Sequence, residues 1–291
     1  EKAAGGELPA VALRAVTIED SRVTYKDAAS NQTLTLGVET LTVAAGPGNP
    51  IKLDMKGSYN GDAFTVNGEL GEFAELLRPT KPWPLMVKAT AGGATVTAKG
   101  AIAYPDKASG IDINLDVEGD DLSKMSKLAG APVPPLGPYA LNAKVTGSMD
   151  KAIELSGLKA TMGKSGLAGN ASVKLQGKPS ITATLNSDLL DLDDFNKPVS
   201  EGGATAPSGG GSSKDGAGGG SAGAKDGKRL FPDDPLPVDA LKAADAKVDL
   251  SVRKLLANKL AVENFKTVVA LRNGDLAVSP ISGDVAKGKL A

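Results

Sequence analysis

The sequence contains no cysteine and no histidine. Without cysteine, the chain has no disulfide, no thiolate nucleophile and no zinc–thiolate site. Without histidine, it lacks the usual acid–base group near neutral pH and the commonest ligand of transition metals. Side-chain chemistry is therefore restricted mainly to carboxylates. The missing cysteines do not identify a compartment, because an oxidising environment permits disulfides without requiring them.

Aromatic residues and an excess of one charge are scarce as well. Ten of the 291 residues are aromatic, and the net charge is −1, with Lys and Arg scattered singly among Asp and Glu. The sequence shows no basic face that could neutralise phosphates, so we expect no nucleic-acid partner. The hydrophobic 41% consists largely of Ala, Val and Leu. Such small aliphatic side chains favour a thin, elongated sheet over a deep globular core.

A long apolar run is also missing. No 18 consecutive residues are apolar, so we expect no helix of this sequence to span a bilayer. The sequence starts at Glu1 and stops at Ala291 inside a strand-like pattern. We therefore expect it to be a segment whose membrane anchor or targeting sequence lies upstream.

The main pattern that is present is alternation of apolar and polar residues with a period of two. Residues 138–192 show it best, in four consecutive runs. Successive side chains leave a strand on opposite sides, so each run predicts a strand with one apolar and one polar face. Together the four runs predict an antiparallel meander that is covered on one face only.

The first forty residues predict two further strand arrangements. Residues 13–18 and 22–25 predict a hairpin that turns at residues 19–21. Residues 33–43 predict one long strand whose apolar positions change register after Val38. A single inserted residue, a β-bulge, would cause such a shift.

Two distinct signals follow along the chain. Residues 51–59 and 64–70 predict paired strands joined by Asn60-Gly61-Asp62, since Asn and Gly tolerate positive φ. Trp83 stands between two prolines. We expect this lone tryptophan to plug the open end of a sheet, with a ligand-stacking platform as the alternative.

Three short helices are predicted between groups of strands, at residues 72–78, 121–130 and 189–195. Pro79 ends the first, and Asp121 is placed to cap the second. A group of strands followed by a short helix thus recurs along the chain. This indicates a loose internal repeat, in which each unit adds strands to one sheet.

Residues 199–228 differ in composition, because 11 of the 30 are Gly and most others are Ser, Ala, Lys and Asp. Such a segment cannot bury enough apolar surface to order itself, so it predicts a flexible linker. It contains no Gly-x-x-x-x-Gly-Lys-Ser/Thr motif of a phosphate-binding loop. We expect a β-repeat region at 1–198, the linker, and a truncated β region at 229–291 that continues the same sheet.

More alternation follows the Pro-rich residues 230–241. The predicted strands and the tight turn between the last two lie at 246–252, 260–262, 265–271, Asn273-Gly274 and 276–280. The meander is therefore expected to resume after the linker.

Acidic residues gather at Asp120-Asp121, at Asp188 with Asp191, Asp193 and Asp194, and at Asp233-Asp234. Two carboxylates about 5–10 Å apart could hydrolyse a glycoside, and four near one turn could hold calcium. Helix caps and turns explain the same residues without a ligand. We expect caps and turns, because the regular ligand spacing of a calcium loop is missing, and we name no catalytic, cofactor or metal residue.

The apolar strand faces lead to a hypothesis about function. The predicted helices are too short and too few to cover a sheet of this size, so the sheet must curl onto itself or bind something apolar. The expected fold is mainly β, a long curled antiparallel sheet with a groove and a few short helices. We expect acyl chains in the groove, with Leu141, Ala143, Val145, Val173, Leu175, Ile181 and Leu185 as candidate contact residues.

Residues from 230 onward follow a distinctive order of turns and apolar positions. The order runs through Phe231-Pro-Asp-Asp-Pro-Leu-Pro237, Leu241, Ala246-Lys-Val-Asp-Leu250, Leu260, Val262, Asn264-Phe265, Asn273-Gly274-Asp-Leu276 and Ser279-Pro280. It resembles the C-terminal half of the AsmA family, and residues 16–27 and 177–185 resemble the upstream repeats of that family.

This resemblance implies a bacterial envelope protein, held in the inner membrane by an N-terminal helix, with its bulk in the periplasm. It also implies a role in outer-membrane homeostasis, and kinship with proteins whose curled sheets conduct phospholipid between membranes. The anchor helix is not in this sequence, and the strand pattern stops before a full sheet would be complete. The family has no catalytic motif to carry over.

Three classes of function stay open on these grounds. Non-enzymatic handling of phospholipid or other acyl chains is our first expectation. A scaffold that binds outer-membrane proteins or assembly factors through exposed strand edges is the second. A carbohydrate-active enzyme is the third, and it would depend on Asp191 or Asp193. No cofactor is expected.

Overall fold

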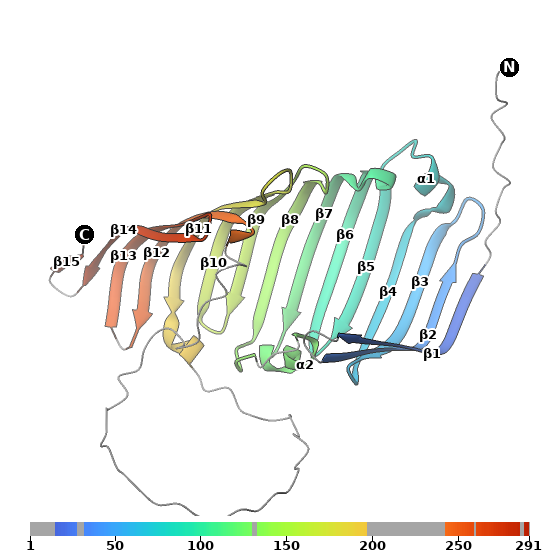
Figure 1. The fold of residues 1–291 in the computed structure, drawn as a ribbon, viewed down its shortest axis with the longest axis horizontal. Helices are drawn as coiled ribbons and strands as arrows, with labels where there is room; N and C mark the ends of the chain where they lie inside the picture. Colours follow the sequence, from blue (N-terminus) through green and yellow to red (C-terminus); the bar gives the residue numbers. More distant parts are fainter. Residues whose placement is uncertain are drawn as a thin grey trace, which may run out of the picture.

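The computed structural model describes residues 15–27, 32–129, 133–196, 242–258, 260–285 and 288–290. These residues form one sheet of fifteen strands, in which each strand lies beside its neighbours in chain order (Figure 1). The strands are β1 (Ala15–Asp27), β2 (Gln32–Ala44), β3 (Pro50–Tyr59), β4 (Asp62–Glu72), β5 (Trp83–Ala91), β6 (Ala94–Tyr104), β7 (Ser109–Gly119), β8 (Tyr139–Ser148), β9 (Ala152–Met162), β10 (Ser165–Lys174), β11 (Ser180–Asp191), β12 (Asp245–Ala257), β13 (Leu260–Arg272), β14 (Asp275–Val285) and β15 (Gly288–Leu290). The expected mainly β fold, built on one long curled sheet, is confirmed.

The helices are short and lie at the ends of strands, along the rims of the sheet (Figure 1). They are α1 (Phe73–Leu77), α2 (Ser126–Ala129) and the 3₁₀ helices η1 (Pro105–Lys107), η2 (Leu122–Met125) and η3 (Leu192–Asn196). The first two predicted helices are confirmed. The third begins later than expected, because residues 189–191 pair with β12 and belong to β11. In the part of the chain that the structure describes, no helix has the length and hydrophobicity to cross a bilayer.

Two local predictions are confirmed in detail. Asn60 and Gly61 have φ of 51° and 87°, and they turn β3 into β4 as the Asn-Gly signal predicts. The register between β2 and β3 shifts between Val38 and Thr40, where one inserted residue was expected. Such a bulge bends the strand that carries it.

The predicted hairpin within residues 13–25 is wrong, because β1 is one continuous strand. Asp20 has φ of 48°. The pairing of β1 with β2 nevertheless keeps one register across it, because Glu19 pairs with Thr40 and Ser21 pairs with Val38. A reversal at Asp20 would have left most of β2 without its partner. The chain therefore bends at Asp20 without turning back, and the parts of β1 and β2 beyond the bend lie toward the viewer in Figure 1.

Residues 260–262 and 265–271 were predicted as separate strands, and this is also wrong. Both belong to β13, which pairs with β12 from Leu271 opposite Ala246 to Leu260 opposite Ala257. Asn264 has φ of 51° and bends β13 in the way that Asp20 bends β1.

The sheet departs from the expected antiparallel arrangement at one place. β11 and β12 are parallel neighbours, paired from Ser180 with Asp245 to Asp191 with Leu256. Parallel neighbours require a crossover connection, so the chain returns over one strand length, about 40 Å, before β12 begins. The predicted linker and the Pro-rich residues 230–241 fall in this connection, outside the described residues.

Trp83 is the largest side chain of a small core at the α1 rim. It is 8% exposed, packs with Ala45 and Ile51, and donates a hydrogen bond of 3.1 Å from Nε1 to the Glu72 carbonyl. Its expected role as a plug over a sheet end is confirmed. Elsewhere the core is thin, and Val252 is the largest described side chain that is less than 2% exposed.

Lys178 fixes the start of β12 after the crossover. Its Nζ donates to Asp245 Oδ1 and to Asn273 Oδ1, and the Asn273 N–H donates to Asp245 Oδ1 at 2.9 Å. The hydrogen bond from Lys178 is the main cause that lowers the pKa of Asp245, followed by the Asn273 N–H. This clasp joins the β10–β11 loop, the start of β12 and the β13–β14 turn.

Replacing Asp245 by Asn is expected to lower the Tm at pH 7 and to lose this effect at acid pH, once the Asp245 carboxyl is protonated in the folded protein. The Asp245 carboxyl has a lower pKa in the folded protein than the unfolded value of about 3.9, so its stabilisation is present above that value. It is lost as the pH falls through the folded pKa. Calorimetry of both proteins across this pH range measures the difference. Asp249→Asn is the control, because the ion pair of Asp249 in the described ranges is with Lys247 of its own strand, at 3.5 Å. A difference that persists at low pH would contradict this role of the clasp.

Candidate functional site

Strand pairing brings six of the seven candidate groove residues onto one side of the sheet. Val145 pairs with Leu155 of β9, Leu155 with Ala171 of β10, and Ala171 with Ala183 of β11. Residues directly opposite in a ladder point to the same side. Leu175 follows the last residue of β10 and lies outside the strand. The same side carries Leu141, Ala143, Val173, Ile181 and Leu185.

This apolar side extends far beyond the four strands named from the sequence. On β7, half-buried Ile111, Ile113, Leu115 and Val117 alternate with the exposed residues Asp112, Asn114, Asp116 and Glu118. Val117, Leu115 and Ile113 pair with Leu141, Ala143 and Val145 of β8. Pairing continues the side to Val16 of β1 in one direction and to Leu276 of β14 in the other. We call this side, from Val16 to Leu276, the apolar face. The alternation that identified β8 could have located the rest of it.

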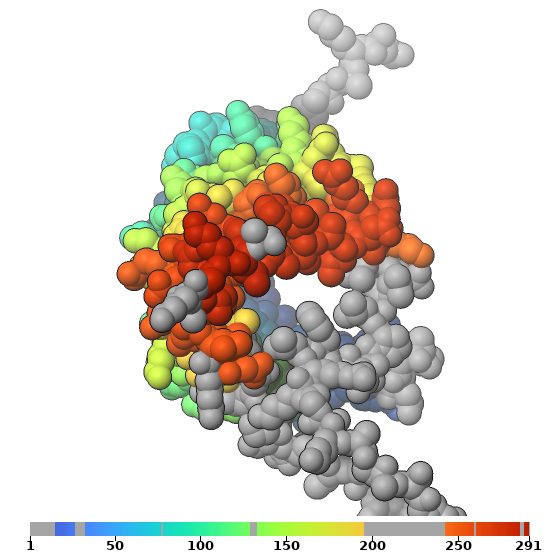
Figure 2. Space-filling model, turned by 90° about the vertical axis from the view of Figure 1, so that its left-hand side faces the viewer, coloured from blue at the N-terminus to red at the C-terminus, as the bar shows by residue number. Residues whose placement is uncertain are grey.

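Shielding shows that the apolar face is the concave one. Ala143 and Ala183 on this face are each 6% exposed, although no second sheet packs on them among the described residues. In a single curved layer, side chains on the concave side converge and shield one another, whereas those on the convex side diverge. Figure 2 shows the resulting hollow beneath the red C-terminal strands, with the blue N-terminal strands visible through it. We call this hollow the trough.

Several large side chains of the apolar face are open to solvent. Val23 and Tyr25 near the tip of the β1–β2 hairpin are each 61% exposed, and Leu276, Val278 and Ile181 are 40–58% exposed. The described helices lie at the rims (Figure 1), where α1 packs on the end of the face around Trp83, and they leave the rest of the face uncovered. A soluble surface rarely exposes apolar side chains in one continuous band, and such a band marks an interaction site.

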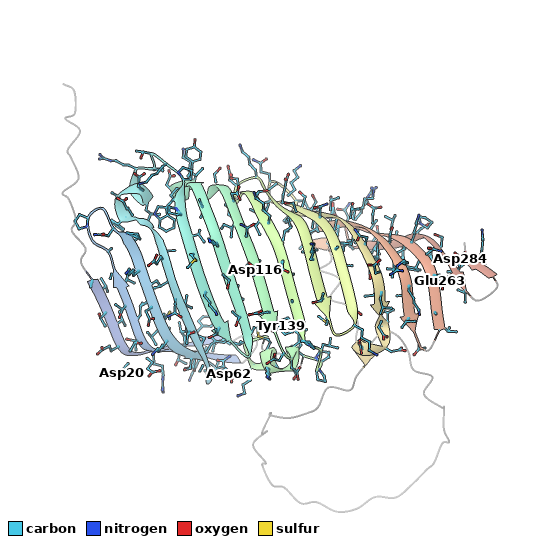
Figure 3. All side chains as sticks on the ribbon, turned by 180° about the vertical axis from the view of Figure 1, so that it is seen from behind. Asp20, Asp62, Asp116, Tyr139, Glu263 and Asp284 are labelled. Atoms are coloured by element: carbon cyan, nitrogen blue, oxygen red, sulfur yellow. The ribbon has the colours of Figure 1, made fainter. Side chains whose placement is uncertain are left out.

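The opposite, convex side carries charged and polar pairs between neighbouring strands. Lys144 of β8 lies 3.1 Å from Asp112 of β7, and Arg253 of β12 lies 3.1 Å from Asp188 of β11. Asn142 donates to Asp116, which Figure 3 labels in a view of the molecule from behind. Exposed pairs of this kind contribute little stability each, but they keep this side of the sheet in water.

The dimensions of the apolar face suit an extended hydrocarbon chain. From Ile111 to Val117 on β7 the face is six residue steps wide, which is about 20 Å. Fifteen strands at a spacing of about 4.8 Å give a length of about 65 Å along the curved sheet. One leaflet of a bilayer has a hydrocarbon depth of about 15 Å, so an acyl chain fits across the width.

Some of the acidic residues weighed from the sequence serve as caps, whereas Asp188 and Asp120 form exposed ion pairs with Arg253 and Lys124. Asp121 Oδ1 accepts a hydrogen bond of 2.8 Å from the Ser123 N–H, which lowers the pKa of Asp121. Asp191 Oδ1 accepts from the Asp193 N–H at 3.1 Å, and Asp193 Oδ1 accepts from the Asn258 N–H at 2.7 Å. The capping role predicted for Asp121 is confirmed. In the described ranges, no three acidic side chains come together as a metal site would require. Asp233 and Asp234 lie outside those ranges.

A second, smaller concavity lies where β1 and β2 bend. Its volume is about 560 Å³, and it is lined by Asp20, Ser21, Arg22, Gly37, Val38, Glu39, Gly57, Ser58 and Ala63. Figure 3 labels Asp20 at the same rim as Asp62 of the β3–β4 turn. The lining mixes polar and apolar residues, and the Ser21 hydroxyl donates to the Glu19 carbonyl rather than to a carboxylate of the lining, so we assign it no chemistry.

Three hydroxyl groups are buried without a hydrogen-bond partner among the described residues, and they belong to Tyr139, Ser187 and Thr267. Tyr139 starts β8 at the rim. Its burial is the main cause that raises the pKa of its hydroxyl, and Asp120 and Asp121 add to the effect. Ser187 and Thr267 lie on the floor of the trough. Sequence reasoning missed both, because an isolated Ser or Thr in a strand carries no signal that distinguishes it from a surface residue.

Comparison with known proteins identifies the family of this chain. A sequence model of the AsmA family matches residues 48–291. The chain is also 25% identical over 249 residues to the AsmA family protein YhjG of Escherichia coli strain K12. That alignment covers 82% of this chain and 35% of the relative, so the chain spans about a third of the relative's length. No solved structure matches the chain. Because the family model covers most of the sequence, the chain belongs to the AsmA family.

Proposed function

We propose that the apolar face binds the acyl chains of phospholipid, and that the chain handles lipid at the bacterial envelope without catalysing a reaction. One observation carries the proposal. A continuous band of aliphatic side chains lines the concave side of a curled sheet, and no second layer of described residues covers it.

The energetic argument is the transfer of hydrocarbon out of water. Burial of each CH₂ group contributes about 0.8 kcal/mol, and an acyl chain of the length that fits the face carries many such groups. The half-buried aliphatic residues of the face lose their remaining water when such a chain binds. Because the convex side carries the charges, the sheet can present its apolar side to lipid while it stays in an aqueous compartment.

Membership of the AsmA family supports a proposal about where in the cell this lipid binding takes place. We propose that the chain lies on the periplasmic side of the inner membrane of a Gram-negative bacterium, held by an anchor outside this chain. A role in outer-membrane homeostasis would follow if lipid moves along the trough from strand to strand. The width of the face is similar from strand to strand, because most strands have nine to thirteen residues.

The test is to purify the chain from bacterial membranes and to extract it for mass spectrometry of bound phospholipid. We expect retained phospholipid, and we expect it to exchange with isotope-labelled lipid from vesicles. A preparation that neither retains nor exchanges phospholipid would refute lipid binding.

A scaffold for outer-membrane proteins is the second candidate, and the edge strand β14 favours it. Residues 275–281 of β14 are all exposed, and β15 pairs only with its last residues. An exposed edge can add a strand from another protein. Photo-crosslinking separates the two candidates, because phospholipid adducts from Leu141 and Leu185 support the groove, whereas protein adducts from Leu276 on the exposed edge strand support the scaffold.

A further inference from the structure

The floor of the trough is not uniformly apolar where β11, β12 and β13 lie side by side. Ser187 of β11 is 7% exposed and Thr267 of β13 is 6% exposed. Neither hydroxyl has a hydrogen-bond partner among the described residues. A buried hydroxyl without a partner is unfavourable, so two on one floor require an explanation.

Strand register places both residues on the concave side. Ser187 pairs with Val252 of β12, and Thr267 pairs with Leu250, the next residue of β12 on the same side. The two hydroxyl-bearing residues therefore flank β12, two strand spacings apart and offset by two residues. That arrangement separates their Cα atoms by about 12 Å.

The described side chains around these two residues offer no acceptor to either hydroxyl. Val252, Leu250 and Phe265 are apolar neighbours through strand pairing, and the nearby ion pair of Arg253 with Asp188 has 73% and 86% exposed side chains. No carboxylate or amide of the described residues accepts from either hydroxyl. Both hydroxyls are therefore hydrogen-bond donors in an apolar trough. The acceptor for each has to come from outside the described residues.

We propose that Ser187 and Thr267 form a polar subsite that donates hydrogen bonds to the ester carbonyl oxygens of an acyl lipid. This inference rests on the proposed function and goes further, because it assigns the lipid class and a position along the trough. Phospholipid acyl chains join their glycerol through ester carbonyls, which are acceptors without a donor of their own. A pure hydrocarbon would leave both hydroxyls unsatisfied.

The test compares two probes, dipalmitoyl phosphatidylcholine and its dihexadecyl ether analogue, which lacks the two carbonyl oxygens. Binding to the whole chain is measured by competition for a fluorescent fatty-acyl lipid. We expect the ester lipid to bind about tenfold more tightly than the ether lipid, as one to two net hydrogen bonds would give. Equal binding of the two lipids would refute the polar subsite and leave the proposed function standing. Binding of neither would refute the proposed function itself.

The variants Ser187→Ala and Thr267→Val, made together, supply the second readout. Both keep the size of the side chain nearly unchanged and remove the unsatisfied hydroxyl. We expect the double variant to bind both lipids equally and to have an unchanged or higher Tm without lipid, because an unfavourable buried group is gone. A lower Tm without lipid would show that the hydroxyls have a structural partner within the chain, and would refute the subsite. Thr182→Val, at an exposed position of β11, is the matched control and should change neither quantity.

Discussion

Replacement of Gly100 by alanine is expected to lower the Tm by about 4–12 °C, from a loss of about 2–3 kcal/mol of stability. Gly100 of β6 lies between Leu85 of β5 and Ile113 of β7. A Cβ atom at Gly100 would lie 2.0 Å from the Asp112 carbonyl oxygen and 2.7 Å from Ile113 Cα. Both are backbone atoms, which cannot rotate away as a side chain could. The alanine must therefore push β7 from β6 and flatten the curl of the sheet.

Gly166→Ala on β10 is the control for this prediction. A Cβ atom there meets nothing within 4 Å, so the same substitution should change the Tm by no more than a surface mutation does. Circular dichroism during heating measures both variants. If the Gly100→Ala and Gly166→Ala variants had the same Tm, the close approach of β6 and β7 would not be what stabilises the curvature of the sheet.

Replacement of Leu115 by aspartate is expected to reduce bound phospholipid by at least about tenfold. Leu115 lies in the middle of the apolar face, where it pairs with Ala98 of β6 and Ala143 of β8. A bound acyl chain would remove water from the new carboxylate without offering it a partner. Such desolvation is unfavourable by several kcal/mol, and each 1.4 kcal/mol corresponds to a factor of ten in affinity. Native mass spectrometry of the purified variant measures the lipid that it retains.

Asn114→Asp adds the same charge one residue away, on the convex side. Asn114 is exposed and alternates with Leu115, so its variant should retain lipid as the wild type does. A matching melting curve for Leu115→Asp is required, since a misfolded sheet would also lose lipid. Equal lipid retention by the two aspartate variants would mean that lipid does not lie on the apolar face.

Local sequence predicted most of the strands, and the reasons are local too. The alternation on β7 and β8 is complete over each strand, and Asn60-Gly61 and Asn273-Gly274 form the tight turns that their residue types favour. The candidate groove residues were chosen by the same alternation, which is why six of the seven share one side. Leu175 continues the alternation beyond the end of β10, and alternation alone cannot locate that end.

Each of the two strands that the sequence analysis divided in error contains a non-glycine residue with positive φ. Asp and Asn adopt this conformation readily, and it occurs in turns as well as in bends of a continuous strand. At Asp20 and Asn264 the positive φ bends a continuous strand. At Asn60 and Asn273 the positive φ reverses the chain direction in a tight turn. Glycine follows Asn60 and Asn273 but neither Asp20 nor Asn264, and that difference was the available signal.

The sequence by itself determined which residues form strands and which side of each strand is apolar, because both depend on neighbours within a few positions. Only the tertiary structure decided that β12 lies parallel to β11, since that pairing joins residues 65 positions apart, as Ser180 and Asp245 are. It also decided that the apolar side is the concave one and that two hydroxyls on its floor find no partner among the described residues. Curvature arises from bends and close approaches summed over the whole sheet, and no single stretch of sequence contains that sum.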